Sequence, residues 1–374
     1  MIEPATLQQI DRTFVRLGKR KLSYFGGCDY FRLASHPKVI HALQDGVERY
    51  GLNVAASRLT TGNHEIYYTL ERQLAGFFGA KGATLVSGGY ITNLVVAQAL
   101  AGNFSHALLD ARAHPSLKDA ARFLDCPVIQ FRHRDLDHLA ETVKRLGTEA
   151  RLILLTDGMF SNDGSVAPLK DYLKVLPKDA MLLVDDAHGA AVLGESGKGT
   201  LEYTGAGRPR IIQTITLSKA FGAYGGAILG QTSLRQQILS RSSIFIASTP
   251  LPLPLVNASI ESLRILRTDK TLKQRLERNS ATVKSELRKA GFPLPEAPGP
   301  IIQFLPRDKQ EVPILRAKLL QAGIYPPFIM YPNGPVHGYY RFVLSSEHSK
   351  EQIEHLVQVL SQCHLAGSGP NGSH

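Results

Sequence analysis

Seven short, almost entirely apolar runs, separated by longer helical stretches, constrain the fold of this chain most strongly. They lie near residues 84, 107, 128, 152, 182, 212 and 226. Runs of this length without a polar face are typical of strands buried on both sides. Because helical stretches such as 165–176 separate them, the pattern predicts an α/β fold with a mostly parallel seven-stranded sheet and helices on both faces. Binding sites in such sheets form at the carboxyl ends of the strands.

Length and composition indicate a large globular protein. With 374 residues, 43% of them hydrophobic and 20% charged, the chain is long enough for two lobes. We expect an N-terminal segment over 1–45, a large domain over 46–250, a smaller α/β domain over 251–366 and a flexible tail over 367–374. No apolar run is long enough to cross a membrane and the start lacks a signal pattern, so we expect a cytoplasmic protein with no membrane partner.

The charge balance favours small acidic ligands over nucleic acid. The formal net charge is +11, yet the Lys and Arg residues are scattered and form no basic stripe. Cofactor phosphate and an acyl-CoA fit this distribution better than DNA or RNA. The three cysteines, Cys28, Cys126 and Cys363, match no metal-ligand spacing, so no metal site is expected.

Lys219 occupies an unusual position. The apolar run over 211–217 ends in Ser218 and Lys219, and small residues and glycines follow at once. A lysine beside an apolar strand end loses hydration, which favours the neutral amine that can attack an aldehyde and form a Schiff base. The alternative interpretation is a surface lysine after a strand. Thr216, in the same run, is a further candidate for contact with a cofactor.

A second motif supports the interpretation that Lys219 forms a Schiff base with an aldehyde. The run from Met181 to Val184 delivers Asp185 at the carboxyl end of a buried strand, and His188 follows three residues later. Pyridoxal phosphate requires a carboxylate at its pyridine nitrogen, besides the lysine and a phosphate-binding loop. Asp185 is therefore the candidate carboxylate.

These two motifs, in this order, resemble those of the fold type I pyridoxal phosphate enzymes, and more narrowly those of the α-oxoamine synthases. The resemblance covers about residues 25–362 and implies a smaller C-terminal domain, a homodimer and pyridoxal 5'-phosphate as cofactor. It also implies a reaction that condenses a small amino acid with an acyl thioester, carried by CoA or an acyl carrier. Lys219, Asp185, His188 and His114 are the residues to which it assigns catalysis.

The resemblance assigns the phosphate and ring contacts as well. Gly89 and Tyr90 lie in a turn between a strand and a helix, where exposed amide groups can bind a phosphate. His114 lies in a segment similar to the family's Asp-x-x-x-His-x-Ser turn, which implies that it stacks on the pyridine ring; a loop histidine satisfied by its neighbours is the alternative. Ser161 matches the family's Phe-Ser-x-Asp-Gly motif and implies a contact with the cofactor's phenolic oxygen or the substrate.

Three further residues come from the C-terminal half. Ser248 and Thr249 resemble the place where a neighbouring subunit donates hydroxyl groups to the phosphate. A long helical stretch over about 254–291 then leads to Arg341, which matches a family segment and can bind a carboxylate with two parallel hydrogen bonds. Arg341 is thus the candidate for the carboxylate of the amino-acid substrate.

The chain departs from the family at Tyr67, where histidine is usual, and around Gly51, where clustered glycines are usual. We expect Tyr67 to contact the acyl substrate, with local packing as the alternative. The segment Ser57–His64 is most similar to that of the 8-amino-7-oxononanoate synthases, which use L-alanine and a pimeloyl thioester. Glycine with acetyl-CoA, an aminotransferase or lyase reaction, and a catalytically inactive cofactor-binding protein remain as alternatives.

Overall fold

The computed structural model describes residues 5–331 and 334–365. The chain forms two compact units. The larger contains 36–161 and 166–269, and the smaller contains 1–35, 162–165 and 270–374 as far as they are described. The tail expected over 367–374 lies outside the described residues.

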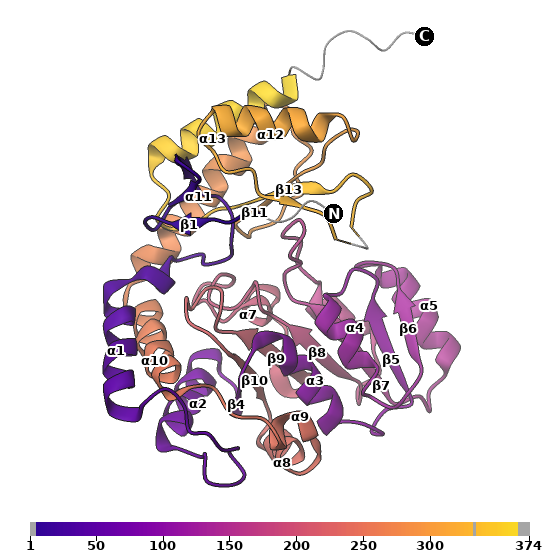
Figure 1. The fold of residues 1–374 in the computed structure, drawn as a ribbon. Helices are drawn as coiled ribbons and strands as arrows, with labels where there is room; N and C mark the ends of the chain where they lie inside the picture. Colours follow the sequence, from indigo (N-terminus) through magenta and orange to yellow (C-terminus); the bar gives the residue numbers. More distant parts are fainter. Residues whose placement is uncertain (1–4, 332–333, 366–374) are drawn as a thin grey trace. The chain divides into compact units, whose positions relative to one another are not determined.

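A seven-stranded sheet forms the centre of the larger unit (Figure 1). Its order is β4-β10-β9-β8-β7-β5-β6, and β10 alone runs antiparallel to its neighbours. The predicted mostly parallel sheet is confirmed. The strands are β4 (Gly82–Val86), β5 (His106–Asp110), β6 (Val128–Phe131), β7 (Leu152–Asp157), β8 (Met181–Asp185), β9 (Ile211–Thr216) and β10 (Gly226–Gly230).

Helices cover both faces of this sheet, as predicted. One face packs against α3 (Gly89–Ala99), α4 (Pro115–Ala121), α8 (Thr232–Arg241) and α9 (Ser243–Ile246). The other packs against α5 (Leu136–Leu146), α6 (Leu169–Val175) and α7 (Thr200–Thr204). The unit also contains α1 (Pro37–Tyr50), α2 (Glu65–Phe78), α10 (Leu253–Thr268) and the 3-10 turn η2 (Arg208–Arg210).

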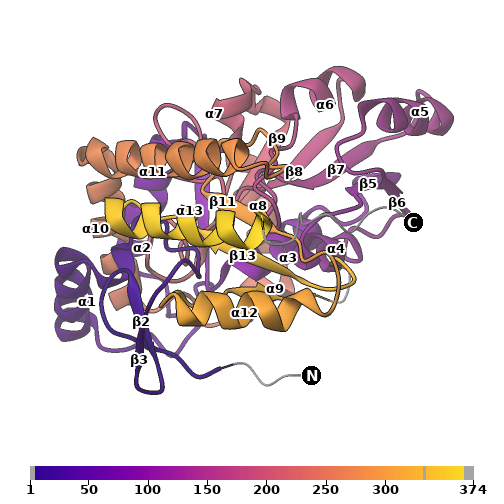
Figure 2. The same cartoon turned by 90° about the horizontal axis from the view of Figure 1, so that it is seen from above.

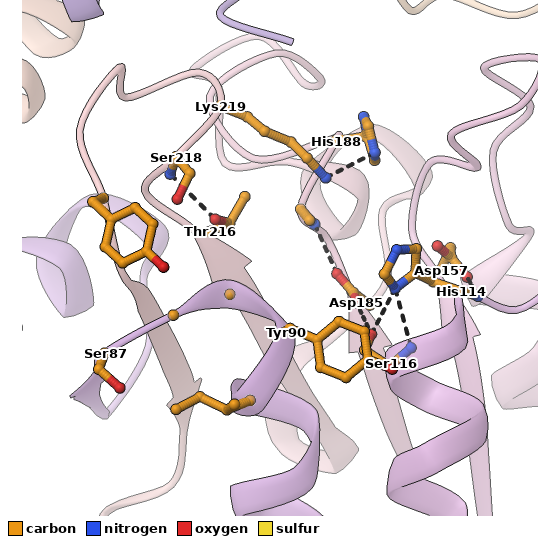
Figure 3. A pocket seen from close by; sticks show the side chains of 15 residues that line it. Ser87, Tyr90, His114, Ser116, Asp157, Asp185, His188, Thr216, Ser218 and Lys219 are labelled. Atoms are coloured by element: carbon orange, nitrogen blue, oxygen red, sulfur yellow. Dashed lines mark hydrogen bonds between the residues drawn. The ribbon is translucent and has the colours of Figure 1, made fainter. Parts of the chain in front are cut away.

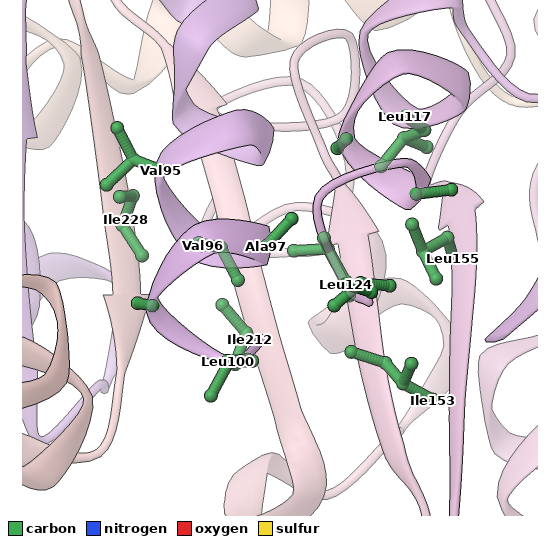
Figure 4. Packing of buried hydrophobic residues seen from close by; sticks show 14 of the residues in the cluster. Val95, Val96, Ala97, Leu100, Leu117, Leu124, Ile153, Leu155, Ile212 and Ile228 are labelled. Carbon is green, nitrogen blue, oxygen red and sulfur yellow. The ribbon is translucent and has the colours of Figure 1, made fainter. Parts of the chain in front are cut away.

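Alternation of side chains along each strand divides the core between the two faces. On β7, Ile153 and Leu155 belong to the cluster under α3 and α4, whereas Leu152 and Leu154 belong to the cluster under α5 and α6. Figure 4 shows the first cluster, in which side chains of α3 face Ile212 of β9. Helices bury both faces of β7, and for this reason its residues 152–155 are apolar on both faces.

The described residues of the smaller unit form two three-stranded sheets and three α-helices. Figure 2 shows α11 (Lys270–Lys289), α13 (Lys350–Leu365) and α12 (Glu311–Gln321) running beside one another. They share a core with a sheet of order β11-β13-β12, formed by β11 (Ile301–Phe304), β13 (Tyr339–Val343) and β12 (Phe328–Ile329). The N-terminal residues add β1 (Gln8–Gln9), β2 (Phe14–Leu17) and β3 (Arg20–Ser23), with the 3-10 turn η1 (Leu33–Ser35) after them.

His348 is buried in the smaller unit, and its ring connects the N-terminal segment at Tyr24 and Phe25 to Ser345. Its Nδ1 accepts the Ser345 N–H over 2.9 Å, its Nε2 lies 3.0 Å from the Tyr24 carbonyl oxygen, and its ring stacks on Phe25. These contacts suit a neutral imidazole with the proton on Nε2. Burial lowers the pKa of His348 to about 3, because desolvation disfavours the charged ring.

No helix within 5–331 and 334–365 combines the length and the apolar composition needed to span a membrane. Over the same residues, no group of three or more His, Cys, Asp or Glu side chains is arranged to hold a metal ion.

Close packing of α1 on α10 depends on a glycine. A Cβ built on Gly46 would lie 2.7 Å from Pro254 Cα and 3.2 Å from Asn257 Cβ. The nearest obstacle is therefore backbone, which cannot rotate away. Gly76 in α2 provides a contrast, because a Cβ there meets nothing within 4 Å.

We expect Gly46→Ala to lower the free energy of unfolding by about 1–3 kcal/mol through overpacking. Gly76→Ala, also inside a helix, should raise it by about 0.5–1 kcal/mol because alanine is the better helix former. Urea unfolding of the two variants and the parent measures both effects. Equal stabilisation by the two substitutions would show that the α1–α10 contact does not require glycine.

Candidate active site

A cavity of about 430 Å³ lies at the carboxyl ends of β7, β8 and β9, next to the start of α3 and α4 (Figure 3). This is the edge of the sheet where sites in parallel α/β folds occur. Seven of the predicted site residues line it: Gly89, Tyr90, His114, Asp185, His188, Thr216 and Lys219.

Lys219 lies in a tight loop between β9 and β10. The loop closes through the Gly222 N–H, which donates to the Lys219 carbonyl, and the Leu217 N–H, which donates to the Gly225 carbonyl, each over 2.9 Å. Gly222 and Gly225 have φ of 60° and 107°, which explains the glycines after the lysine. The Lys219 amine lies 2.8 Å from Nε2 of the buried His188 (Figure 3). The loop thus aims the amine into the cavity.

Three donors orient the buried Asp185 carboxylate. Its Oδ2 accepts hydrogen bonds from Asn93 Nδ2 over 2.7 Å and Ser116 Oγ over 3.2 Å, and its Oδ1 accepts the Ala187 N–H over 3.1 Å. Asn93 is itself held by Thr214 Oγ1, which donates to Asn93 Oδ1 over 2.7 Å. A buried carboxylate with this many donors is held rigidly at one place in the cavity wall.

His114 is the N-cap of α4 and is held at two points. Its Nδ1 accepts the Ser116 N–H over 3.2 Å, and its own N–H donates to Asp157 Oδ2 over 2.8 Å. Burial lowers the pKa of His114, the Asp185 carboxylate opposes this shift, and Lys219 reinforces it. A neutral ring with an apolar face suits stacking on an aromatic ligand.

Asp157 is a second carboxylate in the cavity wall. Burial and the nearby Asp185 carboxylate raise its pKa well above the usual value, while the His114 N–H opposes the shift. Two carboxylates that share a buried region are not readily ionised together. The cavity wall therefore disfavours the ionised form of Asp157.

The start of α3 borders the cavity and has the features of a helix N-terminus that can bind an anion. Its N-cap, Gly88, has no side chain to bind the first helical N–H groups, and its first turn contains no acidic residue. Gly89 packs closely on β9, since a Cβ there would lie 2.6 Å from Thr216 Cβ. The Tyr90 hydroxyl donates to Asp119 over 2.5 Å.

Pyridoxal phosphate fits this set of groups. Lys219 provides an amine, Asp185 a buried carboxylate and the start of α3 a helix N-terminus that suits a phosphate. The cofactor requires groups of these three kinds. The cavity volume is in the range of sites for small ligands.

Three predicted site residues lie elsewhere in the larger unit. Ser248 and Thr249 line a small cavity of about 10 Å³ together with Ser87 and Ile91, which also line the large one. Tyr67 is fully buried, its hydroxyl donates to the Leu251 carbonyl over 2.7 Å, and burial raises its pKa to about 12. A substrate contact for Tyr67 stays a prediction.

Ser161 and Arg341 belong to different units. Ser161 follows β7 in the larger unit and is half-buried. Arg341 lies on β13 in the smaller unit, opposite Gln303 of β11, with Nη2 4.0 Å from Cys28 Sγ. Their contacts with cofactor and substrate stay predictions.

The comparisons with known proteins decide the family. The model of aminotransferase class I and II matches residues 26–360. The chain belongs to the aminotransferase class I and II family. The predicted fold type I architecture is thereby confirmed, and the family agrees with the predicted cofactor.

Two relatives show which members of the family this chain resembles. An 8-amino-7-oxononanoate synthase of Thioalkalivibrio sulfidiphilus is 34% identical over 357 residues, which cover 95% of this chain and 91% of the relative. Another from Methylococcus capsulatus is 35% identical over 340 residues, covering 89% and 87% of the two chains. The predicted resemblance to the α-oxoamine synthases, and within them to this branch, is confirmed.

Solved structures in the family have the same fold. A serine palmitoyltransferase variant from S. paucimobilis, with a bound PLP-myriocin aldimine, has a TM-score of 0.91 at 26% identity, covering 97% of this chain and 92% of that one. An 8-amino-7-oxononanoate synthase from Francisella tularensis has a TM-score of 0.81 at 22% identity, covering 92% and 98%, and shows the fold alone.

The sequence interpretation passed over polar residues in the cavity wall, among them Ser116 and Asp157, and it passed over Asn93, which donates to Asp185. Asp157 had a signal, because it follows Ile153 and Leu155 at a spacing of two and so faces the same side of the sheet. Ser116 lies in the turn that identified His114. Asn93 had no such signal, since its partner Asp185 is 92 residues away in the sequence.

His114 should report the two charges that face it. In the cofactor-free protein we expect it to titrate below the ordinary 6.5, as followed by NMR of its ring protons. Lys219→Ala removes a positive charge and should raise the pKa of His114, whereas Asp185→Asn removes a negative charge and should lower it further. Shifts of the same sign in both variants would contradict this arrangement.

Proposed function

We propose that this chain is a pyridoxal phosphate-dependent 8-amino-7-oxononanoate synthase. It would condense L-alanine with a pimeloyl thioester and release the thiol and carbon dioxide, leaving an α-amino ketone. The observation that carries the proposal is the convergence of Lys219, Asp185 and His114 on one cavity, in a chain about one-third identical to relatives of that name. An aminotransferase reaction on the same fold would consume no thioester.

The residues of the cavity would divide the work as follows. Lys219 would hold the cofactor and, once the amino acid has taken its place, accept the substrate's α-proton. When bound, pyridoxal phosphate supplies a ring that accepts the electrons left on the α-carbon. Asp185 would keep the ring nitrogen protonated, from the place where its three donors hold the carboxylate.

The histidines and the helix start would position the cofactor. The neutral His114 would stack on its ring, and His188 would contact it from the lysine side, supported by the 2.8 Å approach of His188 Nε2 to Lys219. The amides of Gly89 and Tyr90 would bind the phosphate. Thr216 and Ser161 would complete the cofactor contacts.

The remaining parts of the proposal concern the second subunit and the acyl donor. We propose a homodimer in the cytoplasm, in which Ser248 and Thr249 of one copy contact the phosphate in the other. The exposed Tyr90 and Tyr224 in the cavity wall support this, because a second copy would cover their apolar surface. Tyr67, with Arg58 stacked on its ring, would shape the wall toward the acyl donor.

A second candidate is a related condensation with a different pair of substrates. The similarity to serine palmitoyltransferases favours an α-oxoamine synthase that uses another amino acid and another acyl-CoA. Glycine with acetyl-CoA belongs to the same group. The chemistry at Lys219 and Asp185 is shared, so only the substrates separate these candidates.

Thiol release tests the function directly. The purified protein with pyridoxal phosphate, L-alanine and pimeloyl-CoA should release free CoA and form the amino ketone, detected with a thiol reagent and by mass spectrometry. Glycine with acetyl-CoA, and serine with palmitoyl-CoA, are the competing pairs. Lys219→Ala is the control and should abolish turnover. Turnover without thiol release would instead indicate an aminotransferase or lyase.

Arg341 should bind the carboxylate of the amino acid. Arg341→Lys keeps the charge but loses the two-pronged geometry, so the apparent Kd for L-alanine should rise about tenfold or more. Titration of the cofactor's visible absorbance with L-alanine measures it. Arg278→Lys, on the exposed face of α11 in the same unit, is the matched control and should leave the titration unchanged. An equal Kd in the parent and Arg341→Lys would remove Arg341 from the substrate site.

A further inference from the structure

The second acid of the Asp185-Asp186 pair faces away from the cavity. Val184 and Leu182 point into the core under α6 and α7, and Asp186 continues that alternation, whereas Asp185 follows Leu183 toward α3 and α4. Asp186 has no exposed surface. Its Oδ2 accepts the Thr200 N–H over 2.9 Å and Gln213 Nε2 over 2.6 Å, and its Oδ1 accepts Thr200 Oγ1 over 2.6 Å.

Three glycines from three segments close around this carboxylate. Side chains built on Gly158, Gly189 or Gly199 would each collide with an oxygen of Asp186. Gly158 follows β7, Gly189 lies in the turn after β8, and Gly199 precedes α7 with φ of 82°. The segments approach so closely because these positions lack side chains.

Two of the segments that pack on Asp186, those of Gly158 and Gly189, carry cavity residues, and so does β9, which donates to Asp186 through Gln213. Gly158 comes directly after Asp157, and its N–H donates to the Asp185 carbonyl over 2.8 Å. Gly189 comes directly after His188. Gln213 precedes Thr214, whose hydroxyl holds Asn93 against Asp185. One buried carboxylate thus contacts the ends of β7, β8 and β9 from the face opposite the cavity.

Ionisation of the buried Asp186 lowers the free energy of unfolding. Burial raises its pKa to about 6, and the Thr200 and Gln213 donors oppose that shift. Because this pKa is higher than the ordinary 3.8, the free energy of unfolding falls as the pH rises from 3.8 to about 6, and it stays lower above that pH. Gln213 is itself held by Arg208, whose Nη2 donates to Gln213 Oε1 over 2.5 Å. A buried charge that lowers stability has to be explained by something other than stability.

We propose that Asp186 is a positioning residue, which sets the places of Asp185 and His188 in the cavity by fixing the three segments from behind the sheet. It touches neither cofactor nor substrate. The inference rests on the proposed function only in that the cavity binds pyridoxal phosphate. It does not depend on which amino acid or thioester reacts.

Asp186→Ala tests the inference with two readouts. Thr200 and Gln213 lose their common acceptor, and Gly158 and Gly189 lose the side chain on which they pack. Asp185 should therefore move away from His114, and the pKa of His114 in the cofactor-free protein should fall. The Kd for pyridoxal phosphate should rise about tenfold or more, since displacements of an ångström have effects of this order or larger. An unchanged His114 titration together with an unchanged Kd in the folded variant would overturn the inference.

Asp186→Asn keeps the test decisive if the alanine variant does not fold. The amide preserves the shape, accepts from Thr200 N–H and Gln213 and can donate to Thr200 Oγ1, so this variant should fold. Its neutral oxygen is a weaker acceptor than the carboxylate, so the segments are held less firmly and both readouts should shift in the same direction as in Asp186→Ala, by a smaller amount. Parent values in both readouts would overturn the inference.

Glu202→Ala is the matched control. Glu202 is also an acid packed against a glycine, Gly194, and it accepts the N–H groups of Ser196 and Lys198. It holds only the 194–198 loop and no segment with a cavity residue. It should lower the melting temperature without moving the His114 titration or the Kd. If it moves both readouts as Asp186→Ala does, Asp186 has only a general structural role. Failure of the synthase assay would leave these binding and titration results valid.

Discussion

Successive side chains along a buried strand point to opposite faces of the sheet, and the larger unit depends on this alternation. In β7 and β8 it sends apolar side chains into two separate cores, one under α3 and α4 and the other under α5 to α7. The same alternation continues into the polar ends of the strands. Asp157 and Asp185 therefore reach the cavity, while Asp186 points to the other face. The alternation alone accounts for these directions.

The site concentrates acidic groups where burial opposes their charge. Burial raises the pKa of Asp157 and of Asp186, and both lie close to Asp185. The structure responds with neutral donors: Asn93, Ser116 and the Ala187 N–H for Asp185, and Thr200 with Gln213 for Asp186. Donors of this kind hold a carboxylate in one orientation. Removing one of them lowers the free energy of unfolding by more than the hydrogen bond contributes to it, because the partner is left buried and unpaired. The donors therefore fix the positions of the carboxylates more than they stabilise the fold.

Local sequence was a good guide wherever the determining interactions are local. The seven strands, the glycine loop after Lys219 and the helix start at Gly89 follow from periodicity and glycine placement. It was a poorer guide elsewhere. The helical stretch over about 254–291 is divided into α10 and α11 at Asp269, and the three short N-terminal strands have no clear alternating pattern. The bond from the Tyr67 hydroxyl to the Leu251 carbonyl, 184 residues away in the sequence, has no local signal either.

The sequence by itself determined the fold class, the order of the strands along the chain, the family and the identity of the lysine and carboxylate that meet in the cavity. Each of these depends on a short motif or on a period of two residues, which neighbouring residues settle among themselves. The tertiary structure decided which polar residues surround them. Parallel pairing places Asp157 beside Asp185 and Asp185 beside Thr214, and α3 brings Asn93 against both β8 and β9. These neighbours are separated by 28 to 121 residues, so only the register of the sheet and the packing of α3 bring them together.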